Sequence, residues 1–379
     1  MLFDWTEEQL MLQNMLRKFT KNEVAPRDKW MDENGFDWDL HQKMVHTGNY
    51  DITVPEEYGG AGFDFVTGTM AILEVAKGSA SAALILDCFG FGCDILMRYG
   101  TEEQRRKYFP LMRQGQRIGF ALTESTAGSD ATAIRSTATP VEGGGWILNG
   151  EKAWITNMEA EHCILFAKTD PTRGAKGISA FIVSRDSAGF HVGSHEDKMG
   201  LRGTTTGDIS FDNVYLPPEA LLGKVGEGFQ IAMSALDGAR ISISAVAAGL
   251  AHHAMELARN YANERFAFKQ PIAALGGIQA KFADMSARIR AMELMIYDAA
   301  RMKDLGIPNT VEAAQTKLLC STWCTQIALE AMQIMGGNGC SREYHVERFV
   351  RDAKMLEVAE GTTEILKVSI GRNILAQKK

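Results

Sequence analysis

The sequence lacks the cysteine and histidine patterns that commonly hold metal ions or disulfide bonds. Its 379 residues include six cysteines without a Cys-x-x-Cys pair and eight histidines without a His-Glu-x-x-His pattern. Cys320 and Cys324 would share a helical face, but one such pair supplies only half of a metal site. We therefore expect no bound metal and interpret the cysteines as reduced, mostly buried small apolar residues.

A basic excess and a long apolar run are also absent. The formal net charge of −7 argues against a nucleic-acid-binding surface, which requires clustered Lys and Arg. The longest apolar runs, such as residues 82–86, are far shorter than the ~20 residues of a membrane-spanning helix. The first residues contain neither a basic segment ahead of an apolar stretch nor an Arg-rich presequence, so we expect a bacterial-type cytoplasmic protein.

What the chain does contain is helical periodicity toward both ends. Thr6 and Gln9 have the spacing of a capping box ahead of an apolar stripe, and Thr101 and Gln104 repeat that signal. Apolar residues recur every three or four positions across residues 278–296, as they do where helices pack at a shallow angle in a four-helix bundle.

Between residues 118 and 216 the period changes to two, which is typical of β-strands. Gly, Asn-Gly and Pro turn signals separate four strand candidates, at residues 146–149, 163–167, 178–183 and 209–211. We therefore expect an α+β fold of three domains. They are an N-terminal α-helical domain (1–117), a middle antiparallel β domain (118–226) and a C-terminal α-helical bundle domain, a four-helix bundle (227–379).

Residues 120–130 form the most informative stretch of the chain. An apolar pair is followed by the hydroxyl side chains of Thr123, Ser125, Thr126 and Ser129, with Gly128 among them. A strand that runs into such a turn presents backbone N–H groups and short hydroxyls to a ligand rich in acceptors, such as a flavin edge or a pyrophosphate. The alternative is a simple Gly/Ser loop between two elements.

Four more segments follow it in order. They are residues 154–156 (Trp-Ile-Thr), 265–268 (Arg-Phe-Ala-Phe), 333–339 (Gln-Ile-Met-Gly-Gly-Asn-Gly) and 360–364 (Glu-Gly-Thr-Thr-Glu). Together with residues 120–130, in this order and at these separations, they resemble the acyl-CoA dehydrogenase family of flavoproteins over essentially the whole chain. The resemblance implies that family's three-domain fold, an FAD cofactor, an acyl-CoA substrate and an electron-transfer flavoprotein as electron acceptor.

The reaction of that family requires a base for the α-proton of the thioester. A glutamate in an apolar pocket suits this task because burial raises its pKa. The resemblance makes Glu360 the base and lets the backbone at Gly361 approach the ligand, while Thr362 or Thr363 can cap the next helix. By its local sequence alone, Glu360 could equally be an exposed glutamate before a helix N-terminus. The other position at which some members carry the base is Ala239 here, and alanine cannot accept a proton.

The resemblance also supplies contacts for the flavin and the thioester. On the flavin it implies Phe120, Leu122, Thr123, Gly128, Ser129, Trp154, Thr156, Thr362 and Glu364, and on the substrate Ser129, Leu236, Asp237, Arg240, Ala359 and Gly361. In the family, the groups that match Arg265, Phe268, Gln333 and Gly337 reach the flavin of a neighbouring subunit, so a homotetramer built as a dimer of dimers is implied. Without the resemblance, Trp154 could be a core residue, Arg265 could pair with Glu264 on the surface, and Asp237 and Arg240 could form an intrahelical ion pair.

Three positions depart from the family pattern. The chain has Phe268-Lys-Gln270 where Phe-Gly-Lys is usual, so the turn there is expected to be rebuilt. Ala359 replaces the aromatic ring that many members carry before the base, which leaves space beside the α-carbon. Asp87 follows an apolar segment that in the family runs along the acyl pocket, where a small neutral residue is expected.

A carboxylate in an apolar helix is costly unless it is paired or functional, although Asp87 could also face a loop or solvent. We expect it to point into the acyl pocket and, with Ala359, to favour an alicyclic group, such as cyclohexane- or cyclohexene-carboxyl-CoA, or a branched short group. There Asp87 would hold a polar substituent or serve as a second base. The alternatives are an ordinary short-chain (butyryl-type) dehydrogenase, an enoyl-CoA reductase, or a flavoprotein of the same fold with a binding or regulatory role and no dehydrogenase activity.

Overall fold

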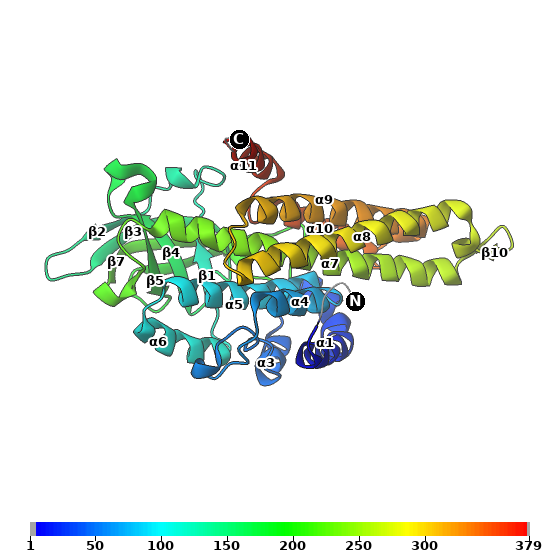
Figure 1. The fold of residues 1–379 in the computed structure, drawn as a ribbon, viewed down its shortest axis with the longest axis horizontal. Helices are drawn as coiled ribbons and strands as arrows, with labels where there is room; N and C mark the ends of the chain where they lie inside the picture. Colours follow the sequence, from blue (N-terminus) through cyan, green and yellow to red (C-terminus); the bar gives the residue numbers. More distant parts are fainter. Residues whose placement is uncertain (1–4, 377–379) are drawn as a thin grey trace.

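The computed structural model describes residues 5–376. Figure 1 shows an elongated molecule with a β-sheet at one end, a long helical bundle that extends to the other end, and the N-terminal helices packed along one side. The order helical, β, helical is the one expected from the sequence. The exact boundaries at 117/118 and 226/227 stay a prediction.

The N-terminal part is helical, and both capping boxes are confirmed. The Thr6 hydroxyl accepts a hydrogen bond from the Gln9 amide at 3.2 Å, and the same pairing recurs between Thr101 and Gln104. These caps set the starts of the first and sixth helices. The six helices are α1 (Glu7–Phe19), α2 (Asp28–Asn34), α3 (Trp38–His46), α4 (Phe65–Ala76), α5 (Ala80–Tyr99) and α6 (Glu102–Arg113).

The middle part is an eight-stranded sheet with the order β6-β7-β3-β2-β4-β5-β8, and β1 pairs with β4 outside this path. All four strand candidates are present, but β3 and β7 are much longer than expected because their polar residues alternate outward. The sheet is mostly antiparallel, as expected; β1 joins β4 in parallel, and β2 and β4 share one parallel pair. The strands are β1 (Ile118–Ala121), β2 (Thr137–Pro140), β3 (Trp146–Thr156), β4 (His162–Lys168), β5 (Ile178–Ser184), β6 (Phe190–His195), β7 (Thr206–Leu216) and β8 (Leu221–Leu222).

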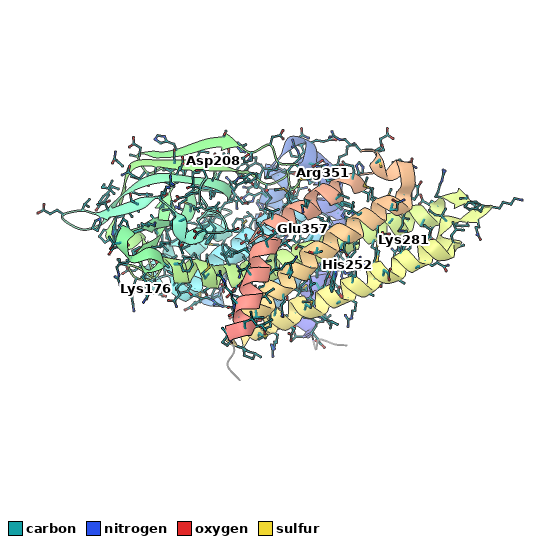
Figure 2. The ribbon with its side chains drawn as sticks, turned by 90° about the horizontal axis from the view of Figure 1, so that it is seen from above. Lys176, Asp208, His252, Lys281, Arg351 and Glu357 are labelled. Atoms are coloured by element: carbon teal, nitrogen blue, oxygen red, sulfur yellow. The ribbon has the colours of Figure 1, made fainter. Side chains whose placement is uncertain are left out.

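The C-terminal part is built around α7, which crosses the molecule and packs against α4, α5, α8 and α9. Gly249 allows the close approach of α4, since a Cβ there would lie 2.4 Å from the Cβ of Ala76. His252, which Figure 2 labels on α7, lies 2.9 Å from Glu293 of α8 and joins the two helices. The elements are α7 (Gly228–Glu264), β9 (Phe266–Ala267), β10 (Gln270–Pro271), α8 (Gly276–Asp304), α9 (Thr310–Met335), α10 (Val346–Val358) and α11 (Thr363–Ala376).

Two helices, α5 and α7, are long and apolar enough to cross a membrane by length and composition. However, 67% and 72% of their most apolar windows are buried inside the molecule, and the two helices pack against each other. Their apolar character is therefore that of core helices.

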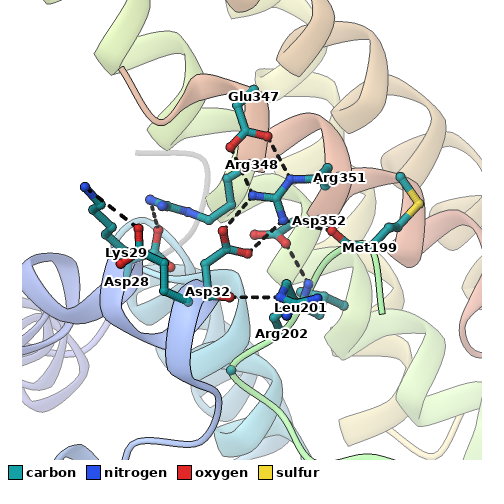
Figure 3. A network of polar contacts seen from close by, with 12 residues as sticks. Asp28, Lys29, Asp32, Met199, Leu201, Arg202, Glu347, Arg348, Arg351 and Asp352 are labelled. Carbon is teal, nitrogen blue, oxygen red and sulfur yellow. Dashed lines mark hydrogen bonds and ion pairs between the residues drawn. The ribbon is translucent and has the colours of Figure 1, made fainter. Parts of the chain in front are cut away.

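A network of charged groups joins the three parts (Figure 3). The Arg351 guanidinium on α10 donates to both carboxylate oxygens of Asp32 on α2, at 2.7 and 2.6 Å, and Arg348 pairs with Asp28 at 2.6 Å. The Asp352 carboxylate accepts from the backbone N–H of Leu201 in the loop before β7. These contacts fix the first and last helical parts and the β-domain loop relative to one another.

Candidate active site

Glu360 lies in a tight turn between α10 and α11. Its φ is 56°, in the left-handed region that residues with a Cβ seldom adopt, and Gly361 follows at φ 109°. The Thr362 hydroxyl accepts from the N–H of Ile365 at 3.4 Å, so Thr362 caps α11. Glu360 is therefore not simply an exposed residue at a helix start, because it is partly buried and carries the strain of the turn.

Two cations from other helices hold this turn by its backbone. Lys317 on α9 donates to the carbonyl oxygens of Glu357 and Gly361, at 2.8 and 2.7 Å. Arg240 on α7 donates to the carbonyl of Glu360 at 3.3 Å and to the carboxylate of Asp237 at 2.9 Å. The intrahelical pair between Asp237 and Arg240 is thus present, and the same arginine also reaches the turn.

The site has the electrostatics of a poised base. Burial raises the pKa of Glu360, while the positive charges of Arg240 and Lys317 oppose the shift. Burial also raises the pKa of Asp87 to about 7, Ser242 opposes the shift, and the charge of Glu360 adds to it. Two carboxyl groups whose pKa values move toward neutrality therefore share one region of the interior.

A cavity of about 390 Å³ lies between α4, α5 and α7. Asp87 is in its wall and only 5% exposed, so the alternative in which this carboxylate faces solvent is wrong. The hydroxyl of Thr69, also in the wall, is buried and has no hydrogen-bond partner among the described residues. Glu360 is not among the lining residues, which also include Thr53, Ile72, Gly90, Phe91, Met97, Gly238 and Ser242.

The residues expected beside the flavin ring gather at the sheet end of the molecule. The turn after β1 is closed by backbone hydrogen bonds between Glu124 and Ala127. The buried carboxylate of Glu124 accepts from Lys152 at 2.8 Å and from Ser136 at 2.7 Å. This anchor keeps the turn in place while Ser125, Thr126, Gly128 and Ser129 stay exposed at its tip, and Thr123 is partly exposed.

Trp154 on β3 is 55% exposed and has a φ of 59°, so its interpretation as a core residue is wrong. Thr156, two residues later, is partly exposed. The ring of Phe120 on β1 contacts that of Phe91 in the cavity wall, with centroids 4.9 Å apart, while Leu122 is buried. The sheet end of the site thus adjoins the cavity.

Four further residues that are expected to contact FAD lie at the opposite end of the molecule. Arg265 and Phe268 are in the β9–β10 hairpin at the tip of the bundle (Figure 1), and Gln333 and Gly337 lie close by, where Asn338 donates to the Tyr261 hydroxyl at 3.0 Å. One chain therefore does not bring them to the sheet end. Arg265 is exposed and makes no ion pair within residues 5–376, so its pairing with Glu264 is wrong.

The β9–β10 hairpin turn has an unusual backbone, and its expected difference from the family's turn stays a prediction. Phe268 and Lys269 have φ values of 52° and 67°, the two left-handed positions of a two-residue hairpin turn that normally favours Asn-Gly. The ring of Phe268 is 84% exposed. A strained turn that displays an aromatic ring is typical of a contact surface.

Two anchors of the site were missed in the sequence, Lys317 and the Glu124–Lys152 pair. A signal for Lys317 exists, because it occupies the same helical stripe as the buried Ala313, Ala314, Cys320 and Cys324. No local signal exists for Glu124 and Lys152, which come from the turn after β1 and from β3.

Comparison with known proteins agrees with this geometry. The acyl-CoA dehydrogenase N-terminal, middle and C-terminal domain profiles match residues 6–116, 119–214 and 226–375. An acyl-CoA dehydrogenase of Bacillus subtilis is 43% identical over 98% of both chains. The butyryl-CoA dehydrogenase structure from Megasphaera elsdenii superposes with a TM-score of 0.96 at 36% identity, covering 98% of this chain and 99% of that one.

A second solved structure, from work on the electron-transferring flavoprotein of Acidaminococcus fermentans, has a TM-score of 0.95 at 37% identity. It covers 99% of this chain and 100% of that one. Matches of this extent cover all three parts of the molecule. The chain belongs to the acyl-CoA dehydrogenase family of FAD-containing oxidoreductases that act on CH–CH bonds.

Proposed function

We propose that this acyl-CoA dehydrogenase acts on a thioester with an alicyclic acyl group, such as cyclohexane- or cyclohexene-carboxyl-CoA, and that Glu360 removes the α-proton. The observation that carries the substrate proposal is the buried carboxylate of Asp87 in the wall of the cavity between α5 and α7. A simple straight acyl chain offers nothing for a second base or a hydrogen-bonding group at this depth to act on. A ring offers a further C–H bond or a polar substituent at this position.

Glu360 suits the role of base because its pKa is raised and its backbone is fixed. A carboxylate with a raised pKa is a stronger proton acceptor near neutral pH than one in water. Gly361 adds no side chain where the thioester would approach, and Ala359 leaves space beside it. The carboxylate receives the α-proton while its backbone carbonyl stays bonded to Arg240.

Asp87 supports two roles in the cavity. Protonated, it can donate a hydrogen bond to a polar ring substituent; ionised, it can accept a proton from a ring carbon distant from the thioester. In the second case Asp87 would take the single proton of the step in place of Glu360, and FAD, when bound, would accept the hydride from a second C–H bond. The electron pair left by the proton forms the new double bond.

The residues at the sheet end suit the flavin half of FAD, and the residues at the bundle end suit its other half. At the sheet end, the exposed hydroxyls of residues 123–129 and the exposed ring of Trp154 suit a polar flavin edge and its ring face. At the bundle end, the exposed guanidinium of Arg265 suits a pyrophosphate and the exposed ring of Phe268 suits an adenine. When bound, FAD supplies the hydride acceptor for the β-carbon.

Because these halves lie at opposite ends of one chain, we propose a homotetramer, a dimer of dimers, in which each flavin contacts two subunits. We also propose an electron-transfer flavoprotein as the electron acceptor and a cytoplasmic location. The similarity to the Acidaminococcus structure supports the choice of acceptor.

The test is a panel of CoA thioesters with linear, branched, cyclic and dicarboxylic acyl groups, each mixed anaerobically with the purified enzyme. The rate at which the visible flavin absorption bleaches gives the reductive half-reaction for each. We expect the cyclic thioesters to bleach the flavin fastest. Faster bleaching by butyryl-CoA would instead support a short-chain dehydrogenase, the second candidate, which the similarity to the butyryl-CoA enzyme favours.

A further inference from the structure

The comparisons with known proteins assign no role to the buried amine of Lys317. We propose that Lys317 is a positioning residue, which holds the turn after α10 by two backbone carbonyls and so fixes the carboxylate of Glu360. The inference rests on the proposed role of Glu360 as the base.

Lys317 bridges the two sides of the turn. Its Nζ lies 2.8 Å from the carbonyl oxygen of Glu357, three residues before Glu360, and 2.7 Å from that of Gly361, one residue after it. The carbonyls at the end of a helix have no partner inside the helix, and a cation there satisfies them and the helix dipole. The amine therefore ties the last turn of α10 to the start of α11.

The turn needs such a support because its backbone is strained. Glu360 has a Cβ and a φ of 56°, a conformation that persists only where the surroundings impose it. Arg240 holds the carbonyl of Glu360 from α7, and Lys317 holds the carbonyls on either side from α9. Two helices thus determine the direction in which the Glu360 side chain leaves the backbone.

The burial of Lys317 argues that the contact is specific. Its side chain is 0% exposed, and no carboxylate lies within 4.0 Å of its Nζ in the described part of the chain. An ammonium group buried without an ion-pair partner is costly, and an apolar residue would pack in its place at lower cost. What an apolar residue cannot do is hold two carbonyl oxygens.

The charge of Lys317 acts on Glu360 as well. Burial lowers the pKa of Lys317 to about 8, and the charge of Glu360 opposes the shift, so the amine is mostly charged at neutral pH. The other charged groups that face it are Arg240, Glu357 and Glu364. The titratable groups that face Glu360 are Arg240, Lys317 and, from α5, Asp87 and Cys88.

Two substitutions separate the geometric effect from the charge. Lys317→Met removes both donors and the charge, whereas Lys317→Gln removes the charge but keeps an N–H₂ group that can reach a carbonyl. We expect Lys317→Met to slow flavin bleaching by about 100-fold, the effect of a ~1 Å misplacement, with less than about threefold change in thioester affinity. We expect Lys317→Gln to retain a larger share of the rate.

The acid limb is the part of the pH profile in which the bleaching rate falls as the pH is lowered. In both variants, this acid limb should move to higher pH, because a positive charge that favours ionised Glu360 is lost. Lys198→Met is the matched control. Lys198 is also buried and donates to the oxygens of Thr204 and Thr206, in the loop before β7 and at its first residue. Its loss should lower the melting temperature and leave the acid limb in place.

The proposal is overturned if Lys317→Met bleaches at a near wild-type rate with an unmoved acid limb. It is also overturned if Lys317→Met and Lys198→Met lose rate and melting temperature in parallel with no shift of the limb. Glu360→Gln distinguishes these failures from failure of the proposed base. If that variant stays active, Glu360 is not the base, whatever the Lys317 variants do.

Discussion

The carboxylates of Asp87 and Glu360, from α5 and from the turn after α10, interact through the protein interior. The charge of Glu360 adds to burial in raising the pKa of Asp87 to about 7. Ionised Glu360 therefore disfavours ionisation of Asp87.

The first prediction concerns Glu360→Gln. An amide has the shape of the carboxylate but cannot take a proton, so FAD content and thioester affinity should stay roughly unchanged while bleaching slows by several orders of magnitude. Stopped-flow absorbance measures the rate, and the flavin spectrum measures the FAD content. Bleaching near the wild-type rate would move the base elsewhere, with Asp87 the next residue to test.

Substitution of Asp87 tests the substrate proposal. Asp87→Ala should slow bleaching by a cyclohexene-carboxyl thioester at least about 100-fold and leave butyryl-CoA unchanged or faster, because the cavity loses a carboxylate that a small aliphatic chain leaves poorly solvated. Asp87→Asn keeps a hydrogen-bonding group without a base. If it restores the cyclic rate, Asp87 acts by hydrogen bonding, and if not, by proton transfer. Equal losses for both thioesters in Asp87→Ala would leave a short-chain dehydrogenase as the better interpretation.

Arg265→Ala should weaken FAD retention and the tetramer together. The guanidinium is exposed and unpaired within residues 5–376 of one chain, and loss of a charged contact at a buried interface costs ~2–5 kcal/mol. Flavin content after gel filtration and sedimentation velocity measure the two effects. Arg259→Ala on α7, the helix that leads into the hairpin, is the control, since the exposed Arg259 forms a surface ion pair with Glu256. A stable tetramer with full flavin would show that Arg265 is an ordinary surface residue.

The polar network between the domains predicts a pH-dependent stability. Burial raises the pKa of Asp352 to about 7, with the charge of Asp28 adding to the shift, so the folded state favours the protonated form. The stability that Asp352 contributes is therefore present below pH ~4, its unfolded range, and is lost as the pH rises through about 7. Asp352→Asn, which keeps an oxygen acceptor for Leu201 N–H, should be more stable than wild type at pH 8, by ~1–4 kcal/mol.

The gain in stability of Asp352→Asn over wild type should shrink as the pH falls toward ~4. Urea unfolding of both proteins at several pH values would measure this change. Asp28→Asn breaks the pair with Arg348 and should destabilise the protein instead. A less stable Asp352→Asn at pH 8 would show that the carboxylate is needed as a charge.

Much of the fold follows from local signals in the sequence. Two helix starts are indicated directly by the capping boxes at Thr6 and Thr101. The packing face of α8 is indicated by its buried apolar stripe, which consists of Met285, Ile289, Met292 and Ile296. The parallel pairing of β1 with β4 could not be predicted, because it joins segments about forty residues apart that have β2 and β3 between them in the sequence.

The burial of Asp87 in a cavity wall was predictable, because a carboxylate within an apolar helical segment is costly unless it is paired or functional. The role of Glu360 as the base stays a prediction. The site was not predictable where position alone matters. By its apolar ring alone Trp154 could be a core residue, yet its ring is 55% exposed and its φ is 59°. Lys317 reads as a surface lysine until tertiary packing buries it. In both cases, long-range packing overrides the preference of the residue.

The ion pair of Asp32 with Arg351 spans 319 positions of the chain. Because a ribosome makes the N-terminus first, Asp28 and Asp32 are made long before their guanidinium partners. Those acids have no counter-charge of this kind until nearly the whole polypeptide exists, and the same late segment carries Glu360. Completion of the N-terminal helical layer and assembly of the turn that carries Glu360 are therefore expected to be late and linked events in folding.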